Sequence, residues 1–315
     1  MASGSSGYRE GEFDLHGMRA LFRQIALPLA LCVAVFIVAS YSMSLPRSSE
    51  GISSIWLTNG LPLAALLRSP RRQWPWLVAA AMIGNAAALL YRLDTGALLT
   101  AYRATGNAVQ YTLCAYILRR RFGGHIDITQ PTELIWIGLV GMLTTGIKLA
   151  WIIAGYGVIE PAMVFLSANI LPWLFSNSLG LFVLLFPILA VTAPREGATD
   201  RIDALGALFL AILGGALFLV FGPPNFPAFF LILPPLMLLA WRHGLRGAGI
   251  GTLFTIIMAA GLSQIDEGGI TGKLVTAGFS PLLRGAYLEL FFTVAILCSL
   301  PPAVARARQQ RVDMA

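Results

Sequence analysis

The sequence has few charged residues. Of its 315 residues, only 12% are Asp, Glu, Lys or Arg, whereas soluble globular domains carry about 25%. Hydrophobic residues make up 57% of the chain, and the mean hydropathy is +0.75. This composition excludes an ordinary soluble domain and indicates an integral membrane protein.

The sequence also lacks a pattern typical of a catalytic or metal site. The three cysteines lie far apart inside apolar runs, which favours a role as small apolar residues over disulfides or zinc ligands: Cys32, Cys114 and Cys298. The three histidines stand alone in polar stretches, so we expect solvated loop residues: His16, His125 and His243. The sequence therefore predicts no catalytic residue, no metal and no cofactor.

The formal net charge of +7 is not typical of a nucleic-acid-binding surface. The basic residues lie in short segments between apolar runs instead of along one helix face. We therefore expect the lipid bilayer as a partner and no nucleic acid.

Long apolar runs follow one another along the whole chain and predict an all-α, polytopic transmembrane bundle. The first run, residues 21–45, exceeds the apolar core of a signal peptide, which is about 7 to 15 residues long. Nine further runs follow, at about 51–67, 74–91, 97–118, 134–155, 163–192, 203–222, 226–241, 248–262 and 286–302. Several are shorter than the roughly 20 residues that a spanning helix needs. We expect about ten spans, some short or broken, with eight as the fallback.

The same runs define the expected domain organisation. Residues 1–20 form a polar tail, residues 21–305 one membrane domain, and residues 306–315 a basic tail. With ten crossings and the N-terminus inside, sixteen of the 22 Lys and Arg residues fall on inner segments and four on outer segments. Because Lys and Arg accumulate on cytoplasmic loops, both termini are expected to be cytoplasmic.

Strongly polar residues inside the runs gather toward the outer ends of the expected spans. They are Asn59, Asn85, Arg103, Lys148, Asn169 and Glu289. Arg103, Asn107 and Gln110 follow i, i+4, i+7 spacing, so they share one helix face that is expected to point into the bundle. This shared depth indicates a polar site that opens toward the periplasm.

Other interpretations of these residues stay open. A charge at the centre of a spanning helix costs about 2.5 to 3.5 kcal/mol on insertion scales. Arg103 and Lys148 can lower this cost by snorkelling or by ion pairing, and Glu289 by pairing with either of them. The asparagines can also serve only to hold helices together.

Glycine and proline are expected to break two helices close to the polar residues. Gly60-Leu61-Pro62 and Leu171-Pro172-Trp173 predict interruptions, which free backbone groups that need burial or water. Gly247 and Gly251 form a GxxxG pair, for which we expect internal helix packing first and a dimer contact second.

Several short motifs, taken in order, resemble one known family. They are residues 55–61 (IWLTNGL), Gly84-Asn85, residues 173–187 with Leu179-Gly180, residues 233–242 followed by 244–248 (GLRGA), and residues 288–292 (LELFF). Over about residues 25–305 the chain is similar to the bacterial membrane-associated sensor domain called MASE, type one. The resemblance implies a sensory module of the inner membrane, usually with eight spans and usually fused to a diguanylate cyclase, phosphodiesterase or histidine kinase. Asn177 stands where this family commonly has an acidic residue.

We therefore expect a non-catalytic sensor that binds a small ligand or lipid component from the periplasmic side. The predicted site comprises Trp56, Asn59, Asn85, Arg103, Lys148, Trp173 and Glu289. Its amides and cations would orient a polar group, and its tryptophans would form an apolar wall.

No GGDEF, EAL or kinase sequence follows Arg311. The output partner is therefore expected to act in trans, as a cytoplasmic diguanylate cyclase or histidine kinase, and a homodimer is an additional expectation. The alternatives are a small-molecule transporter, with the same residues as its substrate site, and a membrane scaffold.

Overall fold

The computed structural model describes residues 15–44, 56–93, 96–123, 126–159, 167–193, 202–222, 228–265, 278 and 281–313. Throughout these residues the secondary structure is helical, with no strand. The helices are α1 (Leu15–Ser44), α2 (Gly60–Arg68), α3 (Trp74–Leu93), α4 (Ala97–Phe122), α5 (Pro131–Ile159), α6 (Ser167–Val191), α7 (Ala204–Phe221), α8 (Leu233–Ile265) and α10 (Pro281–Asp313). Short 3-10 turns, η1 (Arg71–Gln73) and η3 (Phe229–Ile232), precede α3 and α8. The all-α prediction is confirmed.

Helix length and composition do not confirm the expected ten spans. Seven helical segments of the described chain are long and apolar enough to cross a membrane. The segment α2 has only 9 residues, about 14 Å at 1.5 Å per residue, and is too short to cross alone. The helix α4 has 26 residues but is not among the seven, because the polar face predicted for it lowers its hydropathy.

Two of the expected runs, 226–241 and 248–262, belong to one helical stretch that reverses direction. Gly244 has φ 58° and ψ −144° inside α8, a conformation that an L side chain rarely adopts. Beyond it, Gly251 lies against the side chains of Leu236 and Leu239, which a straight helix would place about 18 to 22 Å away along its axis. We conclude that α8 is a tight hairpin with arms 233–243 and 245–265, and that Gly251 of the GxxxG pair packs internally, as predicted.

The two predicted helix interruptions have different outcomes. The first is confirmed, because α2 begins at Gly60 and Pro62 occupies its first turn, where a missing N–H leaves no intrahelical bond unmade. The second is wrong, because α6 runs from Ser167 to Val191 without a break. Pro172 is the sixth residue of α6, so it removes one hydrogen bond near the start of the helix without ending it.

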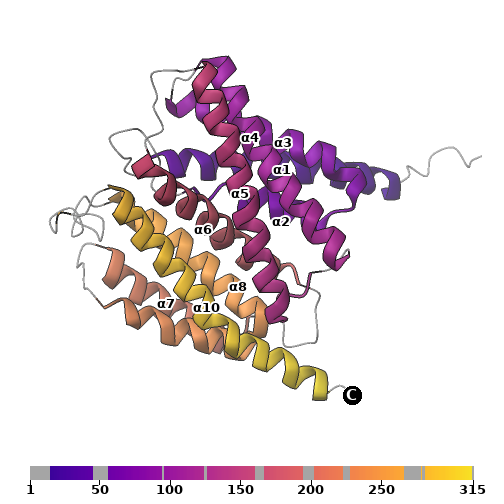
Figure 1. The fold of residues 1–315 in the computed structure, drawn as a ribbon. Coiled ribbons are helices and arrows are strands. Elements are labelled where there is room, and N and C mark those ends of the chain that lie inside the picture. Colours follow the sequence, from indigo (N-terminus) through magenta and orange to yellow (C-terminus); the bar gives the residue numbers. More distant parts are fainter. Residues whose placement is uncertain are drawn as a thin grey trace, which may run out of the picture.

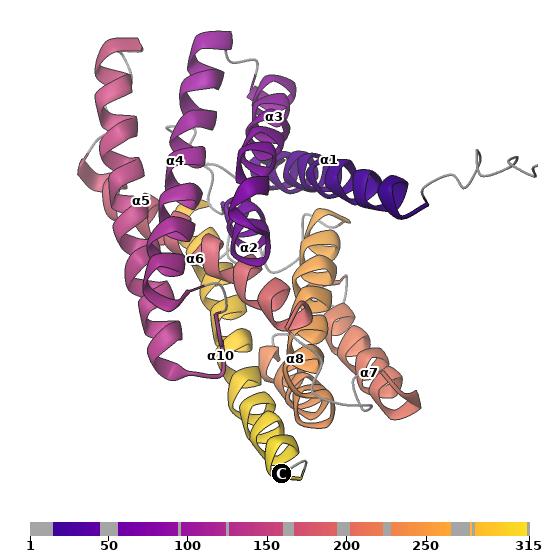
Figure 2. The same ribbon diagram turned by 90° about the vertical axis from the view of Figure 1, so that its right-hand side faces the viewer.

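The helix α6 occupies the middle of the fold (Figures 1 and 2). It contacts α2 and α5 on one side and α8 and α10 on another. Leu181, Leu185 and Leu189 of α6 join the apolar cluster formed mainly with α1 to α5, to which α10 adds Ile296 and Leu300. Val183 and Leu184 join a second cluster, formed with α7, η3, α8 and α10. The two groups of helices are therefore packed on different faces of α6.

The histidine prediction is wrong for His243. This residue ends the first arm of α8, is buried, and places its Nε2 3.2 Å from Oδ1 of Asp203. Asp203 also caps α7 by accepting the N–H of Gly206 at 2.9 Å. The guanidinium of Arg242 binds the same carboxylate and holds the pKa of Asp203 well below its ordinary value. The side chain of His16, and His125 as a whole, lie outside the described residues.

Gly247→Ala tests the hairpin. A Cβ at this position would lie 2.2 Å from the carbonyl oxygen of Leu239, so the two arms must move apart. We expect a loss of about 1 to 3 kcal/mol, as in other overpacked cores, measured as a lower midpoint of thermal unfolding in detergent. Gly261→Ala is the matched control in the same arm, because a Cβ there meets nothing within 4 Å. Equal midpoints for the two variants would contradict the hairpin.

Candidate functional site

The segment that leads into α2 carries two of the predicted site residues and lies directly on α6. A Cβ on Gly180 would lie 2.2 Å from the carbonyl oxygen of Trp56, and one on Gly60 would lie 2.6 Å from that of Leu181. The two backbones come this close because both positions are glycine. Trp56 and Asn59 are thereby held beside the first half of α6.

Lys148 of α5 is buried in this region, with 4% of its surface exposed. Its Nζ donates to Oδ1 of Asn177 at 2.7 Å, and Asn177 in turn donates to the carbonyl of Trp173 at 3.1 Å. The ammonium also lies 5.7 Å from the ring centroid of Trp56 and 5.1 Å from that of Trp173. These are cation–π distances, and such contacts contribute about 2 kcal/mol when desolvated. The tryptophans thus flank a cation, a polar role that differs from the expected apolar wall.

Glu289 of α10 is completely buried, with 0% exposed. Its Oε1 accepts a hydrogen bond from the hydroxyl of Ser176 at 3.1 Å. The alternative of an ion pair with Arg103 or Lys148 is not realised, because the ion pairs found among the described residues involve Asp203. Ser176 and Asn177 are neighbours in α6, so this helix joins a buried carboxyl group to a buried ammonium.

An amide network continues the cluster toward α4. Asn59 donates from Nδ2 to Oδ1 of Asn107 at 3.2 Å and to Oε1 of Gln110 at 2.5 Å. Gln110 donates to the hydroxyl of Thr145 at 2.7 Å, one turn before Lys148 on α5. Asn107 and Gln110 are both buried, so the predicted inward face of α4 is confirmed at these positions.

Two of the seven predicted residues are not joined to this network. Asn85 of α3 is buried, but neither atom of its amide has a hydrogen-bond partner in the described part of the chain. Arg103 is half-buried, one turn before Asn107, and the ion pairs among the described residues do not join it to Glu289. The structure therefore brings together Trp56, Asn59, Lys148, Trp173 and Glu289. The side chain of Asn169 lies outside the described residues.

Five residues that connect the site were not part of the predicted site: Asn107, Gln110, Thr145, Ser176 and Asn177. The helical spacing on α4 indicated the first two, and the departure from the family pattern drew attention to Asn177. Nothing in the sequence singles out Thr145 or Ser176, because their role depends on which helices become neighbours.

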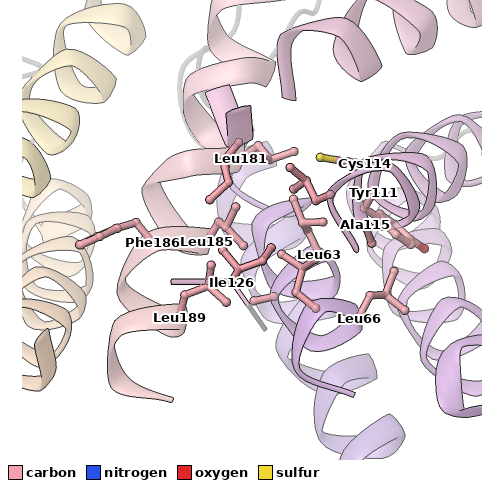
Figure 3. Packing of buried hydrophobic residues seen from close by; sticks show 14 of the residues in the cluster. Leu63, Leu66, Tyr111, Cys114, Ala115, Ile126, Leu181, Leu185, Phe186 and Leu189 are labelled. Atoms are coloured by element: carbon pink, nitrogen blue, oxygen red, sulfur yellow. The ribbon is translucent and has the colours of Figure 1, made fainter. Parts of the chain in front are cut away.

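Each helix of the network becomes apolar in the same direction away from the cluster. Asn59 is followed in α2 by Leu63 and Leu66, and Asn177 is followed in α6 by Leu181 and Leu185, all four fully buried or nearly so. Figure 3 shows these leucines packed together with Cys114 of α4. The polar cluster is thus closed on this side by apolar packing.

The donors and acceptors of the cluster suit an organic ligand better than a metal. Across the described residues, no three His, Cys, Asp or Glu side chains gather in one place. The groups present are an ammonium, amides, hydroxyls, indoles and one carboxyl. Together they can orient a small polar molecule through hydrogen bonds and charge.

Gln110→Met tests the amide network. The change keeps the side-chain length but removes the acceptor of Asn59 and the donor to Thr145. We expect a loss of about 1 to 3 kcal/mol, because buried polar partners are left unsatisfied, measured by denaturant unfolding in detergent. Thr112→Val, on the same helix, should be neutral or stabilising, because the Thr112 hydroxyl has no partner among the described residues. A neutral Gln110→Met would contradict the network.

The comparisons with known proteins give one match. No curated protein and no solved structure matches the chain. The model of the MASE1 family, a family of membrane-associated sensor domains, matches residues 25–311. This range runs from α1 to the last turns of α10 and includes every residue of the polar cluster, so the chain belongs to the MASE1 family.

Proposed function

We propose that this chain is a non-catalytic sensory domain of the bacterial inner membrane. It binds a small ligand or lipid component from the periplasmic side and relays binding to a cytoplasmic output partner. Membership of a sensor family and the buried polar cluster support this function. The observation that carries it is the link from Lys148 through Asn177 and Ser176 to Glu289, because this link connects two groups of helices at one polar site.

The arginines support a periplasmic position for the site. Arg68, at the end of α2, donates to the carbonyl of Leu189 and to Thr192 at the end of α6. Arg119, in the last turn of α4, donates to the carbonyl of Ser69. These contacts lie beyond the buried leucines, at the ends of α2, α4 and α6 that are far from Lys148. Because arginine-rich ends favour the cytoplasm, the polar cluster belongs on the opposite side.

The crossing number that fits this arrangement is ten, with both termini cytoplasmic. The α8 hairpin provides two antiparallel arms, and the non-helical residues 56–59 together with α2 provide a broken crossing. Broken crossings occur where irregular backbone is buried in protein, and Thr58 and Asn59 are buried.

The relay runs along α10. This helix has 33 residues, and Glu289 lies about 36 Å from its final residue at 1.5 Å per residue. Pro301 and Pro302 lie inside it and remove backbone hydrogen bonds, which marks a place where the helix can bend. Near the same end, Gly244 of the α8 turn lies beside Arg306. A displacement at Glu289 therefore reaches the cytoplasmic end and the α8 hairpin.

The partner expected at that end is a diguanylate cyclase or histidine kinase domain, with a homodimer as an additional arrangement. Transport is less favoured, because the leucines around Leu63 and Leu181 fill the bundle beyond the polar cluster. A transporter would need polar lining through to the other face.

Crosslinking the full-length chain in its native membranes, followed by mass spectrometry, tests the relay. We expect a cyclase or kinase to be captured, and its product output to depend on the chain. Lys148→Met and Glu289→Gln should each change that output at least severalfold while the chain still reaches the membrane. Asn85→Leu is the matched control, because Asn85 is buried but outside the network.

Two results would contradict the proposal. Uptake of a solute into vesicles that follows a defined ion gradient would identify a transporter. Mild and fully additive stability losses for Arg103→Met and Glu289→Gln, without any change in output, would identify a scaffold.

A further inference from the structure

Several buried polar atoms of the polar cluster have no hydrogen-bond partner. In the described chain, five such atoms lie in residues 56–59, in α6 next to Asn177, and on Glu289, and others lie elsewhere, for example on Asn85 and Thr112. The five in the cluster are Nε1 of Trp56, Oγ1 of Thr58, Oδ1 of Asn59, Oγ of Ser178 and Oε2 of Glu289. Each unsatisfied buried group lowers the stability of the fold. The five atoms in the cluster are explained by a ligand that supplies the missing partners.

An anionic group in the ligand best complements Lys148 and Trp56. The ammonium of Lys148 has three donors, and in the described residues its one hydrogen-bond acceptor is Asn177. The two indole rings stabilise the cation from the side but do not neutralise it. Nε1 of Trp56 adds a second buried donor without an acceptor. A carboxylate or phosphate oxygen beside Lys148 and Trp56 satisfies both groups.

Another part of the ligand must be a strong donor. Oε2 of Glu289 and Oδ1 of Asn59 are buried acceptors without donors. The hydroxyl of Ser176 donates to the other carboxyl oxygen, and the backbone N–H of Trp56 also lies near this carboxyl group, but neither is a charged donor. An ammonium group has enough donors for both acceptors and provides the charge opposite to that of a carboxylate.

The donors that need an anion and the acceptors that need a donor lie close together. Lys148 and Glu289 are bound to neighbouring residues of α6, whose Cα atoms are about 3.8 Å apart, yet they form no ion pair with each other. Trp56 contacts the ammonium of Lys148 through its ring. A cation and a carboxyl group that are near each other but separate match a small molecule that carries an anion and an ammonium a few bonds apart.

We propose that the site binds such a zwitterion, with its anionic group on Lys148 and Trp56 and its ammonium on Glu289 and Asn59. This inference rests on the proposed function. Two sources carry this chemistry: a free amino acid, and a phospholipid whose phosphate is followed by an ethanolamine ammonium.

Thermal unfolding of the full-length chain tests the ligand class. The free probes are the twenty L-amino acids, their α-hydroxy acids, which lack the ammonium, and their amides, which lack the carboxylate. The lipid probes are nanodiscs of phosphatidylethanolamine with phosphatidylglycerol, and of phosphatidylglycerol alone. We expect at least one zwitterionic probe to raise the unfolding midpoint by several degrees and its single-charge analogues to have at least tenfold lower affinity.

Two variants give a result that a purely structural role would not produce. Glu289→Gln should lower the affinity for the zwitterion at least tenfold. It should also reduce the difference in affinity between the zwitterion and the probe that lacks the ammonium, which is the α-hydroxy acid or the phosphatidylglycerol disc. Lys148→Met should lower the affinity for the zwitterion at least tenfold and reduce the difference in affinity between the zwitterion and the amide, which lacks the carboxylate. Asn85→Leu should change neither affinity nor preference.

The outcomes separate the two sources and the two proposals. Stabilisation by a free amino acid identifies a soluble signal, and stabilisation only by the ethanolamine lipid identifies the headgroup. Equal binding of single-charge analogues, or no response to any zwitterion, overturns this inference. If partner output still depends on Lys148 and Glu289 in that case, the sensory function stands and the ligand belongs to another chemical class.

Discussion

The fold depends on how a cation and a carboxyl group are accommodated deep in a membrane protein. Lys148 and Glu289 cannot turn to water, so their partners must come from other helices. Asn177 and Ser176 meet this need from one helix, α6, while Trp56 and Trp173 place their rings beside the ammonium. The close approach of the segment before α2 to α6, at Gly180, follows from the same need, because it brings Trp56 within reach.

Because α6 lies in the middle of the fold, both groups of helices pack against this one helix. Leucines on one face of α6 pack with α2 to α5, and Val183 and Leu184 pack with α7, α8 and α10. The apolar packing is extensive but tolerant, since many arrangements bury the same leucines. The polar contacts are few but specific in direction, so they select one arrangement among these.

The sequence predicted which segments form helices and which polar residues are buried, but not which partners these residues contact. Apolar runs identified where helices form, and polar residues identified one level of the bundle, because both follow from burial along a single segment. Asn59 and Asn85 have the same expected depth, yet only Asn59 joins the network, since the partner is chosen by the packing of other helices. His243 was assigned to a loop because polar residues surround it. The reversal at Gly244 buries it against α7 instead.

Neighbouring residues of a helix point about 100° apart around its axis. Asn177 and Ser176 therefore hold α6 from two directions, one toward α5 and the other toward α10. A small rotation of α6 cannot improve both contacts together: turning it toward Lys148 pulls the hydroxyl away from Glu289, and the opposite turn does the reverse. These two hydrogen bonds together set the angular position of α6 relative to α5 and α10.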